Sequence, residues 1–251
     1  ALRVPRQGLE TALRPGGVGA GHARRLHAVF VVTEVALAMV LLAGAGLVGR
    51  AVLRLSAINP GVDTHHVLVA RTALSAATLA NPEATRTAWA QLLNRIRAVP
   101  GVAAAALVDT VPLRPGNNQI NYWTSATAPP LEQQPSALAT CVSPDYLQTL
   151  GIRLLRGRWF NAGDRQGTLP VAVIDESLAR HAFGSANPIG RKIWIGLSND
   201  PQTIVGVVNH VMYWGPASDP QAKVRDEVYD AIDQLPDRYV LRWSQVRSVA
   251  M

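Results

Sequence analysis

The residues that could carry out chemistry are scattered along this sequence, and they form no recognised catalytic pattern. Asp175 and Glu176 are adjacent carboxylates, which suit the start of a helix better than acid–base catalysis because helix N-termini attract negative charge. His65 and His66 would point in opposite directions on a strand, so they do not predict a metal site. The sequence contains no Walker A, H-E-x-x-H, C-x-x-C or G-x-S-x-G motif. We therefore expect no catalytic residue, no metal and no cofactor, and interpret the chain as a non-enzymatic protein.

Glu34 is the single Asp, Glu, Lys or Arg residue within a long apolar run, residues 26–48. A helix of about twenty residues spans about 30 Å, which is the thickness of the hydrocarbon core of a bilayer. We therefore predict a transmembrane helix over residues 26–54 that contacts membrane lipid. Glu34 lies near one end of the run, so we interpret it as an interfacial or helix-packing residue. An intramembrane acid with a direct functional role is the alternative.

Two small residues, Ala45 and Gly49, lie four positions apart and so share one face of this predicted helix. A small-xxx-small pair of this kind allows a second helix to approach closely. Residues 44–49 read GAGLVG, which also fits G-x-G-x-x-G, but no strand precedes the motif and no ribose-binding acid accompanies it. We reject a dinucleotide site, and take Glu34, Ala45 and Gly49 as candidate residues of the membrane span and of coupling to neighbouring helices.

Arginine dominates the segment before the apolar run, because residues 1–25 contain five Arg and one Glu. The positive-inside rule makes this segment a cytoplasmic linker and places the domain after Leu55 on the outer side, although Arg50 and Arg54 oppose this orientation. A cleaved signal peptide does not fit, because more than twenty polar and Gly-rich residues precede the run. The chain does not begin with Met, and we expect it to be a fragment of a longer protein.

The part of the chain beyond the apolar run has a nearly balanced charge. Residues 55–251 contain seventeen basic and fifteen acidic side chains, although the whole chain has a net charge of +7. A nucleic-acid-binding protein would concentrate Lys and Arg on its folded part, so we exclude nucleic acid as a partner. The single cysteine, Cys141, excludes an intramolecular disulfide and is typical of a small buried residue.

Helical and strand patterns alternate beyond residue 60, which predicts an α+β fold. Asn81 followed by Pro82 predicts a helix start, because Asn caps the first N–H groups and Pro fits the first turn. Asp175 predicts a second cap, for a helix that runs to Phe183. Other segments have strand character, and the main ones are residues 66–74, 102–108, 138–142, 171–174, 189–195 and 203–208.

Residues 112–135 are rich in Pro, Asn, Thr and Ser, and they predict a long excursion from the alternating pattern. A short strand is expected within it at residues 120–124. Its aromatic and amide side chains, Asn121, Tyr122 and Trp123, are interpreted as an exposed surface for a partner.

Several short segments, taken in order, resemble one family: the MacB-like periplasmic core domain of FtsX/MacB-type ABC transporter permeases. Within that group the sequence is most similar to the duplicated orphan permeases typical of Acidobacteria. The resemblance rests on VTEVALA (32–38), PGV (100–102), SPDY (143–146), LGI (150–152), LRGRWF (155–160), VIDESLA (173–179), NPIG (187–190), IVGVV (204–208) and QLPDRY (234–239).

The resemblance implies a two-lobed core domain over residues 55–251 behind the transmembrane helix. A porter-like βαβ lobe would be formed by both ends of the domain, and a mixed lobe would be inserted at about 112–220. The resemblance also implies a partial permease subunit in the bacterial inner membrane, with its large domain in the periplasm. Such a subunit would relay movement from a cytoplasmic ABC ATPase subunit, on which the catalytic residues lie. Further partners would be other permease helices or a second permease half, and a periplasmic adaptor or outer-membrane channel.

Two other functions remain open at this stage. A single-pass, membrane-anchored periplasmic binding or scaffold module would explain the absence of catalytic motifs and the surface at residues 121–123. A membrane-anchored enzyme would rest only on scattered carboxylates and histidines, and is the weakest alternative.

Overall fold

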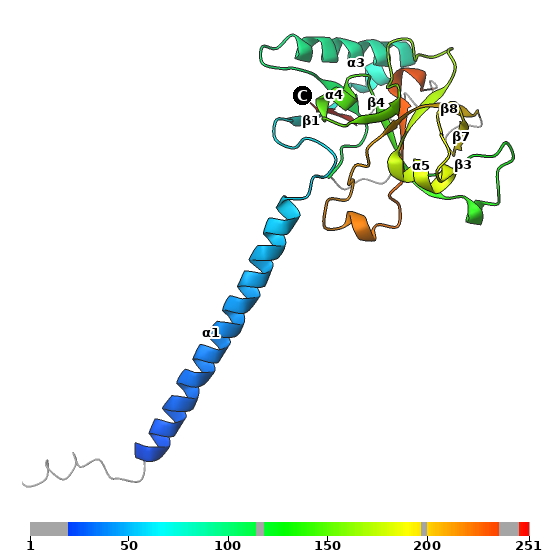
Figure 1. The fold of residues 1–251 in the computed structure, drawn as a ribbon. Helices are drawn as coiled ribbons and strands as arrows, with labels where there is room; N and C mark the ends of the chain where they lie inside the picture. The colour runs from blue at the N-terminus through cyan, green and yellow to red at the C-terminus, as the bar shows by residue number, and fades with distance from the viewer. Residues whose placement is uncertain (1–19, 114–117, 197–199, 236–245, 251) are drawn as a thin grey trace, which may run out of the picture. The chain divides into compact units, whose positions relative to one another are not determined.

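A computed structural model describes residues 20–113, 118–196, 200–235 and 246–250 of the chain. The chain divides into two compact units, Ala1–Ala57 and Ile58–Met251 (Figure 1). The first unit contributes a single described element, and the second contains every described strand.

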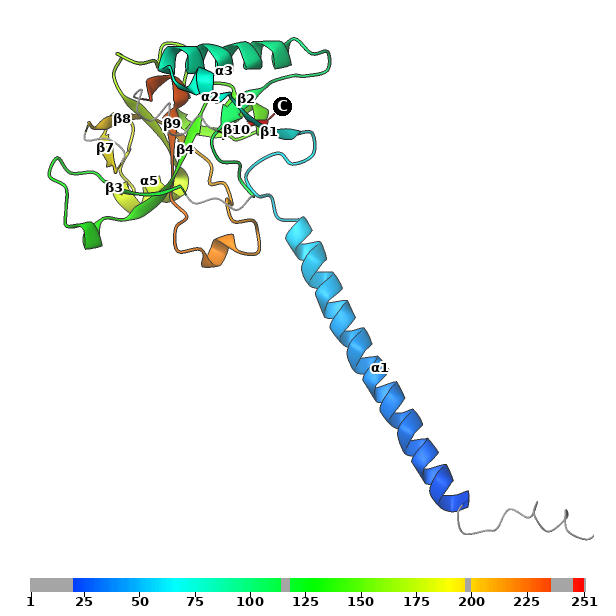
Figure 2. The same cartoon turned by 180° about the vertical axis from the view of Figure 1, so that it is seen from behind.

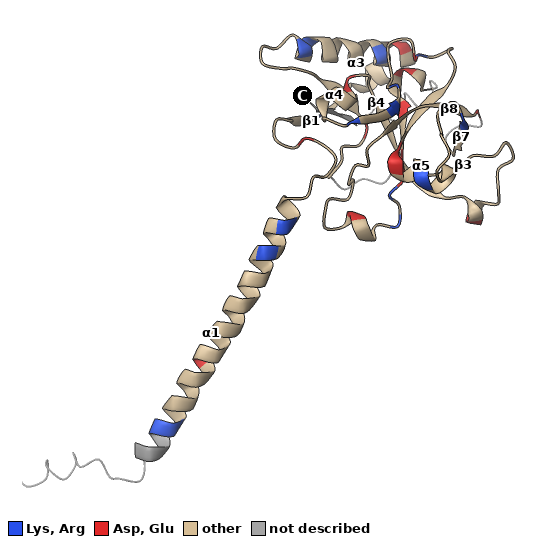
Figure 3. Ribbon diagram, in the orientation of Figure 1, with Lys and Arg blue, Asp and Glu red and all other residues tan. Residues whose placement is uncertain are grey.

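The described element of the first unit is helix α1, Ala20–Ser56, whose 37 residues span about 55 Å. Its segment Arg24–Ser56 is long and apolar enough to cross a membrane, and none of its most apolar window is buried. Figure 3 shows ribbon segments of Lys or Arg toward both ends of α1 and an acidic segment between them. In the sequence these are Arg24, Arg25, Arg50 and Arg54, with Glu34 between them. The helix predicted over residues 26–54 therefore lies entirely within α1.

The second unit is a mixed sheet with short helices. Its elements in chain order are β1 (Val69–Ala73), α2 (Ala76–Leu79), α3 (Pro82–Arg97), β2 (Ala106–Val108), β3 (Gln119–Trp123), η1 (Leu131–Gln133), β4 (Ser136–Val142), α4 (Tyr146–Thr149), β5 (Leu154–Gly157), β6 (Val171–Asp175), α5 (Glu176–Phe183), β7 (Lys192–Ile195), β8 (Gln202–Val208), η2 (Asp219–Gln221), β9 (Glu227–Ala231), η3 (Ile232–Gln234) and β10 (Val246–Ala250).

Six of these strands form a closed ring. From β4 the pairing passes through β3, β7, β8, β6 and β9, and β9 pairs again with β4. The β4–β9 and β6–β8 pairs are parallel, whereas the other pairs of the ring are antiparallel. Strands β2, β10 and β1 extend the sheet outward from β4, so β4 belongs to both parts (Figure 2).

Strand periodicity separates two cores. Ala172 and Ile174 of β6 belong to a cluster that receives a buried residue from every strand of the ring and also contains Leu178 of α5. The alternate residues Val171 and Val173 face a second cluster on the other side of the strand. Because successive side chains of a strand point to opposite faces, the first cluster fills the ring and the second lies outside it.

Helix α3 covers the outer strands. The side chain of Asn81 accepts hydrogen bonds from the N–H groups of Glu83 and Ala84, at 2.8 and 3.2 Å, and Pro82 occupies the first turn. Trp89 and Leu93 are buried against Leu107 of β2. Burying side chains of this kind contributes about 1.5–3 kcal/mol each, which fixes the helix on the sheet.

The predicted α+β class and both predicted helix caps are confirmed. The strands predicted at 66–74 and 102–108 are shorter than expected, because only Val69–Ala73 and Ala106–Val108 are paired. The boundaries of the inserted lobe, about 112–220, stay a prediction; the ring itself includes β9, which follows residue 220.

A glycine in β8 tests how tightly the sheet is packed. A Cβ on Gly206 would overlap the carbonyl oxygen of Arg158. We predict that Gly206→Ala lowers the free energy of unfolding by about 1–3 kcal/mol, because the adjacent backbone must shift. The matched control is Gly196→Ala, whose Cβ would lie 3.4 Å from its nearest neighbour, the carbonyl oxygen of Asn121. Thermal unfolding of the full chain in lipid nanodiscs measures both effects, and equal stability of the two variants would contradict the predicted packing.

Candidate functional site

The first residues of the second unit, 58–63, are bound to a distant loop, and we call them the junction segment. The carbonyl oxygen of Pro60 accepts a hydrogen bond from the N–H of Met212 at 2.8 Å. The carbonyl oxygen of Gly61 accepts one from Nδ2 of Asn209 at 3.0 Å. Gly61 has φ of 88°, and a Cβ there would overlap the carbonyl oxygen of His210. Only glycine therefore allows the junction segment to approach the loop this closely.

The imidazole of His210 lies between two buried carboxylates. Its Nδ1 is 2.7 Å from Oδ2 of Asp175, and its Nε2 is 3.0 Å from Oδ2 of Asp219. Asp219 also accepts a hydrogen bond from Nε of Arg225, at 3.1 Å. Because both ring nitrogens face acceptors, the arrangement favours the doubly protonated imidazolium.

Burial alone would lower the pKa of His210, but its hydrogen bonds to Asp175 and Asp219 outweigh burial and raise the pKa to about 9. The side chain of His210 is only 11% exposed and that of Asp175 is fully buried. The pair is therefore shielded from solvent. Charges in the protein interior interact more strongly than charges at the surface, because the interior has a lower dielectric constant.

Asp175 also joins two regular elements. As the N-cap of α5, its Oδ1 accepts a hydrogen bond from the N–H of Leu178 at 2.8 Å. The same oxygen accepts a hydrogen bond from the N–H of Glu227, the first residue of β9, at 3.1 Å. One carboxylate thus connects the end of β6, the start of α5, the start of β9 and the loop that contains His210.

Strand β9 contains two further buried acids. Burial raises the pKa of Glu227 to about 8 and that of Asp230 to about 7. Glu227 accepts a hydrogen bond from Oγ1 of Thr140 at 2.9 Å, and Asp230 accepts one from Nε2 of Gln202 at 2.6 Å. These acids therefore favour protonation in the folded protein near neutral pH.

The residues predicted for the membrane span all lie on α1. Glu34, Ala45 and Gly49 are exposed there, and a Cβ on Gly49 would meet no atom within 4 Å. Their surface is open to lipid or to further helices, and their roles in packing and coupling stay predictions.

The predicted partner surface at Asn121, Tyr122 and Trp123 needs a correction. Tyr122 is only 2% exposed, because it points into the ring, where its hydroxyl donates to Oδ2 of Asp226 at 2.8 Å. The polar composition around it suggested an exposed excursion, but β3 pairs with both β4 and β7. Asn121 and Trp123 are half-buried, and their contact with a partner stays a prediction.

The sequence did not reveal His210 or Asp219 as members of a site. His210 and Asp175 are separated by 35 positions, and no spacing rule joins them. The available signal was a polar Asn-His pair directly after the apolar residues 204–208. Among the described residues, no group of three or more His, Cys, Asp or Glu side chains could hold a metal ion.

The chain thus combines a long apolar helix with a mixed α+β domain in which six strands close into a ring. Residues 33–244 match the MacB-like periplasmic core domain, and the chain belongs to this family. The finer assignment to the Acidobacterial duplicated permeases stays a prediction.

Curated relatives match shorter parts of the chain. The macrolide export ATP-binding/permease protein MacB of Pasteurella multocida is 42% identical over 67 residues, which cover 27% of this chain and 10% of that protein. MacB of Chromobacterium violaceum is 28% identical over 110 residues, 40% of this chain and 16% of that protein. The probable syringafactin export ATP-binding/permease protein SyfD of Pseudomonas syringae pv. syringae is 36% identical over 76 residues, 30% of this chain and 11% of that protein. The matches thus span at most about a sixth of these relatives.

Solved structures show a more distant likeness. The periplasmic region of MacB from Actinobacillus actinomycetemcomitans aligns with 16% identity and a TM-score of 0.43, covering 64% of this chain and 62% of that one. The extracellular domain of the ABC-type transporter YknZ from Gram-positive bacteria aligns with 16% identity and a TM-score of 0.44, covering 74% and 82%.

The buried acids and His210 predict a fold that loses stability as pH rises. The folded pKa of His210, about 9, exceeds its ordinary 6.5, so its stabilisation is complete below pH 6.5 and is lost by about pH 9. The raised pKa of Glu227 acts in the same direction, between 4.5 and about 8. We predict a lower free energy of unfolding at pH 9 than at pH 6, measured by thermal unfolding of the full chain in nanodiscs.

Substitution isolates the contribution of the histidine. His210→Gln should lower the free energy of unfolding by about 3–5 kcal/mol at pH 6, because it leaves the buried carboxylate of Asp175 without its cationic partner. It should also flatten the pH dependence between 6.5 and 9. The control His66→Gln changes an exposed histidine and should alter neither quantity. An unchanged pH profile in His210→Gln would show that this imidazolium does not stabilise the fold.

Proposed function

We propose that this chain is part of the permease subunit of an ABC-type exporter or mechanotransmission complex. In this role it relays ATP-driven movement from a cytoplasmic ATPase through α1 to the periplasmic domain, which engages a substrate or partner. Membership of the MacB-like family supports this function, and so do relatives whose names join ATP-binding and permease parts. ATP hydrolysis is assigned to the ATPase, and this chain has no catalytic role.

The observation that carries the proposal is the hydrogen bonding of the junction segment, the first part of the second unit after α1. Pro60 and Gly61 are bound to Met212 and Asn209, and the N–H of Asp63 donates to the carbonyl oxygen of Leu150 at 2.8 Å. A displacement of residue 58 must therefore stretch these bonds or move the loop at 209–212.

The same loop would pass a displacement on to the ring. His210 follows Asn209 directly and is held by Asp175, which caps α5 and binds the start of β9. Moving this loop would disturb a buried ion pair, and breaking such a pair costs several kcal/mol. The lower-energy response is for the loop, α5 and the start of β9 to move together.

We further propose that the chain lies in the bacterial inner membrane, with Arg24 and Arg25 at the cytoplasmic end of α1 and the second unit in the periplasm. Its partners would then be membrane lipid, the ATPase, further permease helices or a second permease half, and a periplasmic adaptor or outer-membrane channel. The scaffold-module alternative differs because it requires no ATPase.

The orientation can be tested with single cysteines, because the native Cys141 is only 3% exposed. We predict that Glu132→Cys, an exposed position of the second unit, reacts with a membrane-impermeant maleimide in cells whose outer membrane is permeabilised. His22→Cys should react only after the inner membrane is also broken. The reverse pattern would contradict the proposed orientation.

Relay through the junction segment can be tested by loosening its connection to α1. We predict that inserting Gly-Gly-Ser after Ala57 abolishes any ATP-dependent signal from a fluorophore at Glu132→Cys, because a flexible insert absorbs the movement of the helix. The measurement uses the full-length permease co-purified with its ATPase, in nanodiscs.

The matched control places the same insert after Gly167, in an exposed turn of the second unit. This control should retain the ATP-dependent signal and the ATPase rate. A full signal with the insert after Ala57 would contradict relay through the junction segment. Failure of the permease to co-purify with any ATPase would favour the scaffold module.

A further inference from the structure

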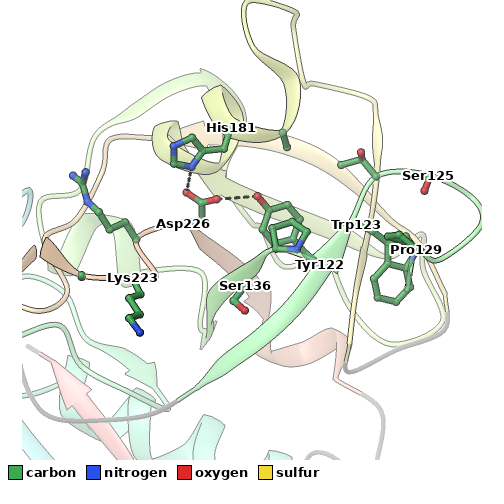
Figure 4. Close-up of a pocket in the computed structure, with 13 residues that line it drawn as sticks. Tyr122, Trp123, Ser125, Pro129, Ser136, His181, Lys223 and Asp226 are labelled. Carbon is green, nitrogen blue, oxygen red and sulfur yellow. Dashed lines mark hydrogen bonds and ion pairs between the residues drawn. The ribbon is translucent and has the colours of Figure 1, made fainter. Parts of the chain in front are cut away.

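A cavity of about 590 Å³ lies beside the ring, between the β3–β4 hairpin, α5 and residues 222–226 (Figure 4). This volume falls within the range of about 300–1,000 Å³ that is typical of small-molecule sites. Three separate parts of the chain line the cavity, so its shape depends on the folded ring and not on one mobile loop.

The floor of the cavity is an acid whose hydrogen-bonding capacity is largely used by the protein. Oδ1 of Asp226 is 2.7 Å from Nδ1 of His181 and accepts from Oγ of Ser177 at 2.9 Å. Its Oδ2 accepts from the hydroxyl of Tyr122 at 2.8 Å (Figure 4). Asp226 is 6% exposed, so this carboxylate fixes the surrounding side chains and offers little to a ligand.

The remaining charge on the walls is positive. Lys223 and Arg225 line the cavity on the segment that leads into β9, and Asp226 is the one acid among the described lining residues. Because Nε of Arg225 already donates to the buried Asp219, Lys223 is the main cation for a ligand. The carbonyl oxygen of Val224, between the two cations, accepts a hydrogen bond from Nε1 of Trp214 at 3.0 Å. This segment is therefore anchored before a ligand arrives, which reduces the entropy that binding must overcome.

The opposite wall, formed by the β3–β4 hairpin, combines apolar rings with several hydroxyl side chains. Trp123 from β3 and Pro129 and Pro135 from the hairpin line it, and Figure 4 shows Trp123 close to Pro129. An indole beside proline rings provides a flat apolar surface against which an aromatic or branched group can pack. Cations on one side and an indole on the other select a ligand that has both kinds of group.

We propose that this cavity binds an amphipathic anion, a small molecule that joins an aromatic or branched apolar body to one anionic group. The apolar body packs on Trp123, and the anionic group pairs with Lys223 and Arg225. This inference rests on the cavity alone and holds whether the chain acts as a relay or as a scaffold module.

The probe is 2-naphthoate, with 2-naphthamide as its uncharged counterpart of nearly identical shape. Equilibrium dialysis against the full chain in nanodiscs, with empty nanodiscs as the blank, should show one bound 2-naphthoate per chain. It should show at least tenfold weaker binding of 2-naphthamide. Equal binding of the two compounds, or no binding of 2-naphthoate, would overturn the proposal.

Two lysines provide a matched pair of variants, because Lys192 is the only other lysine of the chain. Lys192 is exposed on β7, and its Nζ contacts Oγ1 of Thr203 at 2.7 Å, away from the residues that line the cavity. Lys223→Glu should weaken binding of 2-naphthoate at least tenfold, whereas Lys192→Glu should leave it within twofold. An equal loss of 2-naphthoate binding in both variants would show only a general effect of charge, and would refute the proposal that the compound binds in this cavity.

Trp123→Ala tests the apolar part of the hairpin wall. It should weaken binding of both naphthalene compounds, whereas Lys223→Glu should weaken only that of the anion. Near-UV circular dichroism and thermal unfolding check that each variant is folded, and Trp123→Leu, which also removes the aromatic ring, replaces Trp123→Ala if that variant is not folded. Unchanged binding in a folded Trp123 variant would contradict this placement of the apolar body.

Discussion

The buried carboxylate of Asp175 is the constraint on which the rest of the second unit depends. It ends β6, caps α5, accepts the first N–H of β9 and pairs with His210. A carboxylate without these partners would be costly to bury, so its three contacts, with Leu178, Glu227 and His210, must form together. Their formation fixes where β9 begins, and β9 is the strand that closes the ring between β6 and β4.

The start of β9 also connects the two proposed activities. Asp226 forms the floor of the cavity beside Trp123, and the next residue, Glu227, is bound through its N–H to Asp175. The loop at 209–212 meets the same carboxylate through His210, and it is bound to the junction segment. A movement that arrives through the junction segment would therefore reach the cavity floor through one buried ion pair and a few hydrogen bonds. This gives a short physical route by which ligand binding and helix movement can influence each other.

Local features of the fold could be predicted from the sequence, and non-local ones could not. Asn81 and Asp175 cap helices that begin at the next residue, so both caps can be predicted from adjacent positions. The apolar run of α1 is evident from composition alone. The order of the short motifs was sufficient to predict the family. Closure of the ring was not predictable, because it pairs Leu138 with Glu227, far away in the chain. The burial of Tyr122 and the pairing of His210 depend on that closure, which explains why a polar, Pro-rich context gave the wrong interpretation of Tyr122.

We propose that ATP-driven movement reaches the ring through the junction segment and Asp175. Hydrogen–deuterium exchange on the full-length permease with its ATPase, in nanodiscs, tests it most directly. If movement follows this route, ATP turnover should change exchange in residues 58–63, in 209–219 and at the start of β9, relative to the complex with a non-hydrolysable analogue. Exchange in α3, which packs on the outer strands, should change little. Identical exchange in both nucleotide states across these segments would show that the movement does not pass through the junction segment and Asp175.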